Sequence, residues 1–165
     1  MRIGQGLDLH RLEAGHKLWL GGVQIESALG AVGHSDGDAL LHAITDALLG
    51  AIGLGDIGDF FPPSESQWKG VASSVFLAKA LEEVSRAGFQ IENIDSTIIL
   101  ERPKLGVYKA QIQQNIADLL GIEVSRVGVK AKTAEGILGE LGEGKAVLAS
   151  AVALLSAKAL FLSDC

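Results

Sequence analysis

Cysteine is nearly absent from this chain of 165 residues: there is one, Cys165, at the last position. A disulfide framework is therefore excluded, and so is a metal site built from thiolates. A chain without disulfides suits a reducing compartment, and we expect a cytoplasmic protein.

Aromatic residues and long apolar runs are also scarce. No apolar stretch reaches the roughly 18 residues that suggest a membrane-spanning helix, and Met1–Gly4 lacks the apolar core of a signal peptide. Aromatic residues make up 5% of the chain, so a core drawn from its 48% hydrophobic residues must be aliphatic. We expect no membrane partner and a single domain over residues 1–165.

Positively charged residues are also scarce relative to negatively charged ones. Lysine and arginine number 14 against 20 aspartates and glutamates, which gives a net charge of −6. This balance argues against binding to nucleic acid or to an anionic membrane. A small phosphorylated substrate is compatible with it, provided that metals or local lysines neutralise the phosphate charge.

The chain is organised around Gly33–Asp38 and the apolar run that follows it, Ala39–Leu49. Asp38 is a natural N-cap, and apolar residues nearly all round the run predict a buried helix. His42 and Asp46 nevertheless lie on one stripe of this helix, in line with Asp38. Buried polar groups need partners, so the stripe is either a structural hydrogen-bond ladder or faces something polar, such as a metal and its substrate.

Residues 2–13 are predicted to form a strand in which Ile3, Leu7 and Leu9 alternate with polar positions. Asp8 and His10 are two residues apart, so on a strand they point to the same face and can hold one metal ion. Residues 17–25 read as a hairpin that turns at Gly21-Gly22.

The remaining elements follow from periodicity and turn residues. Residues 53–63 are expected to be an exposed loop without regular structure. A helix capped by Ser73 or Ser74 is expected to run to Ala87, with Val75, Leu77, Ala78, Leu81 and Val84 on its apolar face. Strands are expected at 91–100 and 124–131, with a helix at 107–120 between them. Residues 145–162 are ambiguous: propensity favours a helix, whereas a period of two would align Val147, Ala149, Ala151, Ala153 and Leu155 on one face of a strand.

Asp8, His10 and His42 are the candidate metal ligands. Two imidazoles and a carboxylate suit zinc and leave a fourth position open; the alternative is that the three are unrelated polar residues.

The loop His34-Ser35-Asp36 either satisfies backbone groups or supplies donors beside the metal. Residues 132–135, Lys-Thr-Ala-Glu, could bind phosphate and a magnesium or manganese ion, or be ordinary surface residues.

Taken together, these motifs resemble the 2-C-methyl-D-erythritol 2,4-cyclodiphosphate synthase family of the non-mevalonate isoprenoid pathway. The resemblance covers nearly the whole chain. The residues that carry it are Gly4-x-Gly6-x-Asp8-x-His10, Gly21-Gly22-Val23, His34-Ser35-Asp36-Gly37-Asp38, His42-Ala43-x-Thr45-Asp46-Ala47-Leu48-Leu49-Gly50, Gly55-Asp56-Ile57-Gly58, Phe61-Pro62, Asp95-Ser96-Thr97-Ile98-Ile99, Pro103-Lys104 and Val129-Lys130-Ala131-Lys132-Thr133-x-Glu135.

The resemblance implies an α+β fold: a mixed β-sheet flanked by helices on one face, with the sheets of a homotrimer packed around a three-fold axis and active sites at the subunit interfaces. We accept a strand for the last segment on this basis, because alternate small alanines suit three closely packed sheets. It also implies a metal-dependent lyase that cyclises 4-diphosphocytidyl-2-C-methyl-D-erythritol 2-phosphate to 2-C-methyl-D-erythritol 2,4-cyclodiphosphate and releases CMP.

The resemblance further implies roles for individual residues. Zn²⁺ would be held by Asp8, His10 and His42, and Mg²⁺ or Mn²⁺ by Glu135 with substrate phosphates. His34 and Thr133 would stabilise the transition state. Contacts to the methylerythritol phosphate would come from Ser35, Asp56, Ile57, Gly58, Phe61, Pro62, Pro63, Ser64 and Glu65. The nucleotide would bind Leu100, Pro103, Lys104, Leu105, Gly106, Ala131, Lys132 and Thr133. Asp46 is interpreted either as orienting a neighbour of the metal or as a buried structural residue.

The chain departs from the family's pattern in one turn. Glu143 stands where arginine is common, and Lys145 stands where glutamate is common. If this turn meets its symmetry mates, the exchange could preserve salt bridges while removing an anion site on the three-fold axis. Two competing functions also stay open: a zinc phosphohydrolase, and a trimeric nucleotide-binding or scaffold protein without catalysis.

Overall fold

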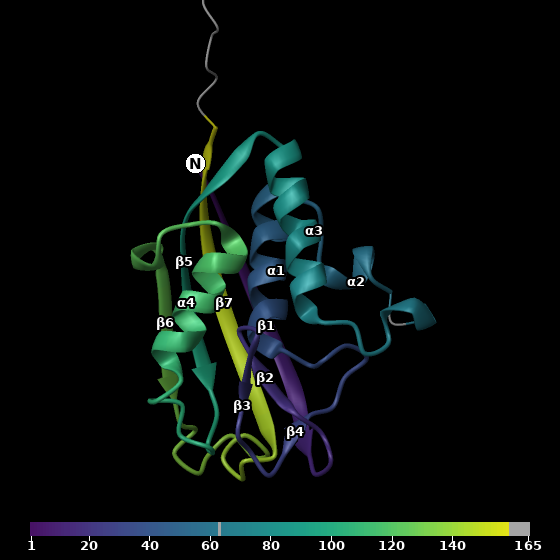
Figure 1. The fold of residues 1–165 in the computed structure, drawn as a ribbon, viewed down its shortest axis with the longest axis vertical. Helices are drawn as coiled ribbons and strands as arrows, with labels where there is room; N and C mark the ends of the chain where they lie inside the picture. Colours follow the sequence, from purple (N-terminus) through teal and green to yellow (C-terminus); the bar gives the residue numbers. More distant parts are fainter. Residues whose placement is uncertain (63, 159–165) are drawn as a thin grey trace, which may run out of the picture.

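The structure is a computed structural model that describes residues 1–62 and 64–158. The chain order is β1 (Arg2–Glu13), β2 (Leu18–Leu20), β3 (Val23–Ile25), β4 (Gly30–Ala31), α1 (Ala39–Ile52), α2 (Ile57–Phe60), η1 (Ser66–Trp68), α3 (Ser73–Arg86), β5 (Phe89–Ile99), α4 (Lys109–Leu120), η2 (Val124–Arg126), β6 (Val127–Lys132) and β7 (Ala146–Ala157). Here η1 and η2 are single 3₁₀ turns. Figure 1 shows α1, α3 and α4 side by side in front of the large sheet, with α2 projecting to one side.

The large sheet has five strands in the order β4-β1-β7-β5-β6. The β5–β6 pair is parallel and the other pairs are antiparallel, so the sheet is mixed. The short β2–β3 hairpin turns at Gly21-Gly22, as predicted. The predicted α+β class, with helices on one face of a mixed sheet, is confirmed.

Small side chains on β1 and β7 let α1 lie close to the sheet. Gly4 and Gly6 pair with Ala153 and Ala151, and all four are buried on the face that α1 covers. A Cβ at Gly6 would overlap the backbone carbonyl of Ala43 on α1. Close approach of backbone to backbone is a usual reason for glycine within a strand.

The strand prediction for the last segment is confirmed, but the reason given for it is wrong. The alternate residues of β7 from Val147 to Leu155 are all fully buried within this one chain, in the same core as α1. Their small size therefore serves the helix–sheet contact inside the chain rather than contacts between sheets. Residues 159–162, the end of the predicted segment, lie outside the described residues.

The opposite face of the sheet is apolar and uncovered in the single chain. Ile3, Leu7, Leu9 and Val152 are 71%, 57%, 56% and 41% exposed. The alternation seen in the sequence of β1 is thus real, but its glycine side faces the core and its Ile/Leu side faces outward. Exposed apolar patches of this kind commonly mark interaction surfaces.

Asp38 begins α1 as predicted and also fastens the hairpin to it. Its Oδ1 accepts hydrogen bonds from the backbone N–H of Leu41 at 3.0 Å and Gly21 at 2.9 Å, and its Oδ2 accepts one from Gly22 at 2.6 Å. The helix ends at Gly53, whose positive φ of 76° is the usual geometry of a C-terminal cap.

Three local predictions are wrong in whole or in part. Residues 53–63 contain a helical turn, α2, because Asp56 and Asp59 form a capping box at its start. Ser73 is the first residue of α3 rather than its cap, which is Ala72. The buried face of α3 carries Phe76, Leu77, Ala80, Glu83 and Val84, whereas Val75 and Ala78 are exposed. The face is rotated because Ser73 points inward to polar partners.

Smaller differences concern element ends. The strand β5 starts two residues earlier than predicted, α4 starts at Lys109, and β6 starts at Val127 after the turn η2. No helix among the described residues is long and apolar enough to cross a membrane.

Candidate metal and nucleotide site

The three predicted metal ligands converge. Asp8 and His10 lie on the face of β1 that α1 covers, and His42 reaches them from the first turn of α1. Asp8 Oδ2 lies 2.9 Å from His10 Nδ1 and 3.0 Å from His42 Nδ1. One ligand atom from each residue lies within 4.8 Å of the other two. This group could hold one metal ion.

His10 supports that interpretation. Among the described residues, its buried Nδ1 has no hydrogen-bond partner, although Asp8 Oδ2 is near enough. A buried ring nitrogen without a hydrogen bond is costly. A cation shared by Nδ1 and the carboxylate would satisfy both groups, so the residues present fit a metal with nitrogen and oxygen ligands.

The charges in the cluster are strongly coupled. Burial would raise the pKa of Asp8, but the adjacent imidazoles of His10 and His42 outweigh it and hold the pKa well below its usual range. Burial would lower the pKa of His42, but its hydrogen bond to Asp8 dominates and raises the pKa. Without a metal, each partner therefore favours the charged form of the other.

This coupling predicts how the metal-free protein responds to pH. The lowered pKa of Asp8 contributes stability above its ordinary value of 3.8, which is lost as pH falls through the lowered pKa. The raised pKa of His42 contributes stability below its ordinary value of 6.5, which is lost as pH rises through the raised pKa. We expect the metal-free protein to be most stable between these values and to lose stability above pH 6.5. Urea unfolding in the presence of a chelator measures this.

His16 provides the control for the pH series, because it is an exposed histidine outside the cluster. His16→Ala should keep the loss of stability above pH 6.5, whereas His42→Ala should remove it. A wild-type stability that stays constant from pH 6.5 to pH 9 would contradict the assignment.

The second ring nitrogen of His42 contacts two serines. Its Nε2 lies 2.8 Å from Ser73 Oγ and 3.1 Å from Ser35 Oγ. Ser73 in turn donates to Asp36 and is completely buried. Ser73 was missed as a site residue because a serine at the start of a helix also reads as a cap.

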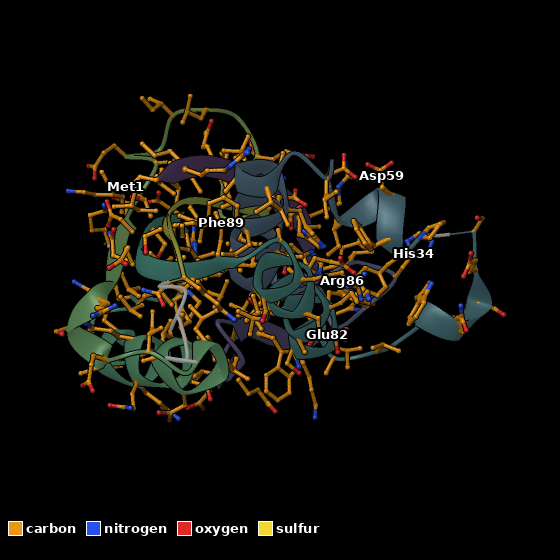
Figure 2. All side chains as sticks on the ribbon, turned by 90° about the horizontal axis from the view of Figure 1, so that it is seen from above. Met1, His34, Asp59, Glu82, Arg86 and Phe89 are labelled. Carbon is orange, nitrogen blue, oxygen red and sulfur yellow. The ribbon has the colours of Figure 1, made fainter. Side chains whose placement is uncertain are left out.

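A pocket of about 380 Å³ opens beside the metal cluster. Of the predicted residues, it is lined by His10, His34, Ser35, His42, Ile57, Gly58 and Phe61. His34 lies on the same side of the molecule as Asp59, opposite Met1 (Figure 2). Trp68 and Phe76 also line the pocket and were not predicted. Their rings lie 4.9 Å and 4.4 Å from the ring of Phe61, and this aromatic cluster forms only when α2, η1 and α3 come together.

The other predicted substrate contacts that the structure describes do not line this pocket. Asp56 caps α2 through the N–H of Gly58 at 2.8 Å. Glu65 accepts a hydrogen bond from Trp68 Nε1 at 3.1 Å. Pro62 and Ser64 are outside the lining residues, and Pro63 lies outside the described residues.

Asp46 connects α1 to the wall of the pocket. Its Oδ1 accepts a hydrogen bond from the backbone N–H of Ile57 at 2.8 Å. Burial raises the pKa of Asp46. Asp46 therefore holds the start of α2, where Ile57 and Gly58 line the pocket. Asp46 is only half-buried, so both alternatives, the orientation of a neighbour of the metal and a buried structural role, stay predictions.

A second pocket, of about 400 Å³, collects most of the predicted nucleotide contacts. Its lining includes Leu100, Lys104, Leu105, Gly106, Ala131, Lys132, Thr133 and Glu135, together with Lys109. Thr133 donates a hydrogen bond to Glu135. Pro103 does not line it; it borders a different hollow.

The two pockets share no residue and lie toward opposite edges of the sheet. Asp8 on β1 pairs with Ala149, Ala149 pairs with Ile98, and Ile98 pairs with Ala131 on β6. Three strand spacings separate Asp8 from Ala131, or roughly 14 Å. A single chain therefore does not bring His34 and Thr133 into one pocket.

The exchanged residues of the divergent turn pair with each other. Lys145 Nζ lies 2.7 Å from Glu143 Oε2. The two exchanged charges are thus matched within the chain, at an exposed position where such a pair contributes little to stability.

Comparisons with known proteins agree with this geometry. Residues 1–156 match the model of the YgbB family. A relative from Treponema denticola, named 2-C-methyl-D-erythritol 2,4-cyclodiphosphate synthase, is 54% identical over 94% of this chain and 96% of its own length. A chloroplastic relative of the same name from Arabidopsis thaliana is 50% identical over 95% of this chain and 68% of its length.

A solved structure of 2C-methyl-D-erythritol-2,4-cyclodiphosphate synthase, described as the form bound to CDP, superposes with a TM-score of 0.87. It is 43% identical and covers 94% of this chain and 100% of its own. The fold, the candidate metal cluster and the relatives thus all support the same family. The chain is a member of the YgbB family, the cyclodiphosphate synthase family that its motifs resemble.

Proposed function

We propose that this protein converts 4-diphosphocytidyl-2-C-methyl-D-erythritol 2-phosphate into 2-C-methyl-D-erythritol 2,4-cyclodiphosphate and CMP, as a metal-dependent phosphorus–oxygen lyase. The observation that carries the proposal is the convergence of Asp8, His10 and His42 beside a pocket lined by His34 and Ser35. The names of the relatives and the CDP-bound structure of one of them support the same reaction.

We propose two metals for this reaction. Asp8, His10 and His42 would hold Zn²⁺, and Glu135 would hold Mg²⁺ or Mn²⁺ together with substrate phosphates. Bound there, the metals would withdraw electrons from the diphosphate and neutralise charge that develops on it.

The chain's own residues then have a limited task. The substrate's 2-phosphate oxygen forms a bond to the diphosphate phosphorus that is attached to the methylerythritol, and the bond from that phosphorus to the bridging oxygen breaks, so that this oxygen leaves with CMP. Both reacting groups belong to one molecule, so folding it correctly can supply up to ~7–11 kcal/mol in well-aligned cases. No side-chain nucleophile is needed. His34 and Thr133 would donate to phosphate oxygens, and Lys132 would offset their charge.

We further propose a homotrimer whose active sites form between subunits. Two observations support it: Asp8 of the metal cluster and Ala131 of the second pocket lie three strand spacings apart in one chain, roughly 14 Å, and the sheet face carrying Ile3, Leu7 and Leu9 is apolar and exposed. Packing these faces around a three-fold axis would bury them. It would also allow the metal pocket of one chain to meet the nucleotide pocket of its neighbour.

The test is product analysis. Purified protein with Zn²⁺ and Mg²⁺ should convert the substrate to CMP and a cyclic diphosphate in equal amounts, which ³¹P NMR distinguishes from hydrolysed monophosphates. Hydrolysed products would favour a zinc phosphohydrolase. Tight CDP binding without turnover would favour a nucleotide-binding protein.

A further inference from the structure

The hydrogen-bond chain behind the metal cluster runs from His42 through Ser73 to Asp36. It connects three segments: α1, the start of α3, and the loop before α1. Ser73 lies completely buried, and its hydroxyl contacts both His42 Nε2, at 2.8 Å, and an oxygen of Asp36. Nothing in the proposed reaction requires Ser73 to touch the substrate.

Proton counting gives the direction of each hydrogen bond. Asp36 receives the backbone N–H of Asp38 at 3.1 Å on Oδ1 and that of Ser73 at 3.0 Å on Oδ2, so its carboxylate acts only as an acceptor. The single hydroxyl proton of Ser73 must therefore go to Asp36. The contact between Ser73 Oγ and His42 Nε2 then needs a proton from the imidazole.

We propose that Ser73 and Asp36 are positioning residues of the metal site, which hold His42 protonated on Nε2 so that Nδ1 faces the metal. Nδ1 is also the nitrogen that lies 3.0 Å from Asp8. This inference rests on the proposed function, because it assumes a metal at Asp8, His10 and His42. Hydrogen bonds to the far nitrogen of a ligating histidine fix both its tautomer and its ring orientation.

The same counting defines the role of Ser35. Its oxygen accepts from the N–H of Gly37 at 3.2 Å and lies 3.1 Å from His42 Nε2 as a second acceptor. Ser35 Oγ also lies 3.4 Å from Ser73 Oγ, whose proton goes to Asp36, so the Ser35 proton is directed either to that oxygen or to a ligand in the pocket that it lines.

The first experiment reads the tautomer in the zinc-loaded wild-type protein. Long-range ¹H–¹⁵N spectra of labelled histidine should show His42 with a proton on Nε2 and a metal-bound Nδ1. A metal-bound Nε2 would overturn the proposal. This measurement requires no variant and no turnover.

The second experiment measures zinc affinity by competition with a chelator. Ser73→Ala should weaken zinc binding by about 10- to 100-fold. Ser74→Ala is the matched control, because it removes a hydroxyl from the same turn of α3 without touching His42, and it should stay within twofold of wild type. Asp36→Asn should also weaken binding by about 10-fold or more, since either orientation of the amide places an N–H₂ group against a donor of Ser73.

The proposal fails if Ser73→Ala and Asp36→Asn both fold and bind zinc within twofold of wild type. If either variant fails to fold, the tautomer in the wild-type protein decides. Neither readout involves the cyclisation. A protein with the expected tautomer and zinc affinity but no CMP release would refute the proposed reaction and leave this inference intact.

Discussion

Replacing His42 with alanine is expected to abolish zinc binding at the candidate site and to lower kcat/KM for CMP release by about 1,000-fold or more. The change removes one of three ligands. Replacing a residue that only hydrogen-bonds to a metal ligand already costs about 10–100-fold in metal affinity or activity. Losing a ligand itself removes several kcal/mol of transition-state stabilisation, which corresponds to a factor of about 1,000 in rate. Zinc content after dialysis and steady-state CMP release measure the two effects.

His16→Ala is the matched control for this experiment, since it removes an exposed imidazole that is not one of the three candidate ligands. It should leave both zinc content and kcat/KM unchanged. Normal turnover by a zinc-free His42→Ala protein would show that the cluster is structural, and the proposed mechanism would be abandoned.

Gly6→Ala is expected to destabilise the folded protein by about 3 kcal/mol or more, as overpacking does where the neighbour is backbone that cannot rotate away. The added methyl group would overlap the carbonyl of Ala43 and push α1 away from β1. Since His42 precedes Ala43, the same displacement should separate the metal ligands. Urea unfolding at fixed protein concentration measures the stability, and the chelator competition measures the affinity for zinc.

Gly50→Ala tests whether this effect is specific to the helix–sheet contact. Gly50 lies within α1, and a Cβ there would meet nothing within 4 Å. Alanine should therefore stabilise the helix by about 0.5–1 kcal/mol. Opposite signs for the two substitutions are expected. Equal destabilisation would show that the close approach of α1 to β1 does not set the cost.

Much of the site could be predicted because its signals are local. Alternation along β1 places Asp8 and His10 on one face, and the position of Asp38 before an apolar run marks the start of α1. These relations depend on backbone geometry over a few residues. The capping pair Asp56 and Asp59 is equally local. The turn α2 was nevertheless not predicted, because the glycines and prolines around it are typical of a loop without regular structure.

Other predictions failed because the deciding contact lies far away in the sequence. Ser73 and Ser74 both read as caps in the sequence, but the contacts of Ser73 with Asp36 and His42 make it the first residue of α3, and the cap is Ala72. The alternate alanines of β7 could face another subunit or a helix with equal ease. Only the position of α1 settles that they face the helix.

The order of residues alone identified the candidate metal ligands, since Asp8, His10 and His42 could be singled out by type, spacing and family resemblance. The tertiary structure decided which side of β1 is the core. Glycine rather than isoleucine and leucine faces inward, because a helix backbone packs closely enough to exclude any side chain there. The tertiary structure also decided that the pocket beside the metal cluster and the pocket lined by Thr133 lie apart in one chain. The order of the strands in the sheet separates β1 from β6, and the sequence does not reveal that order.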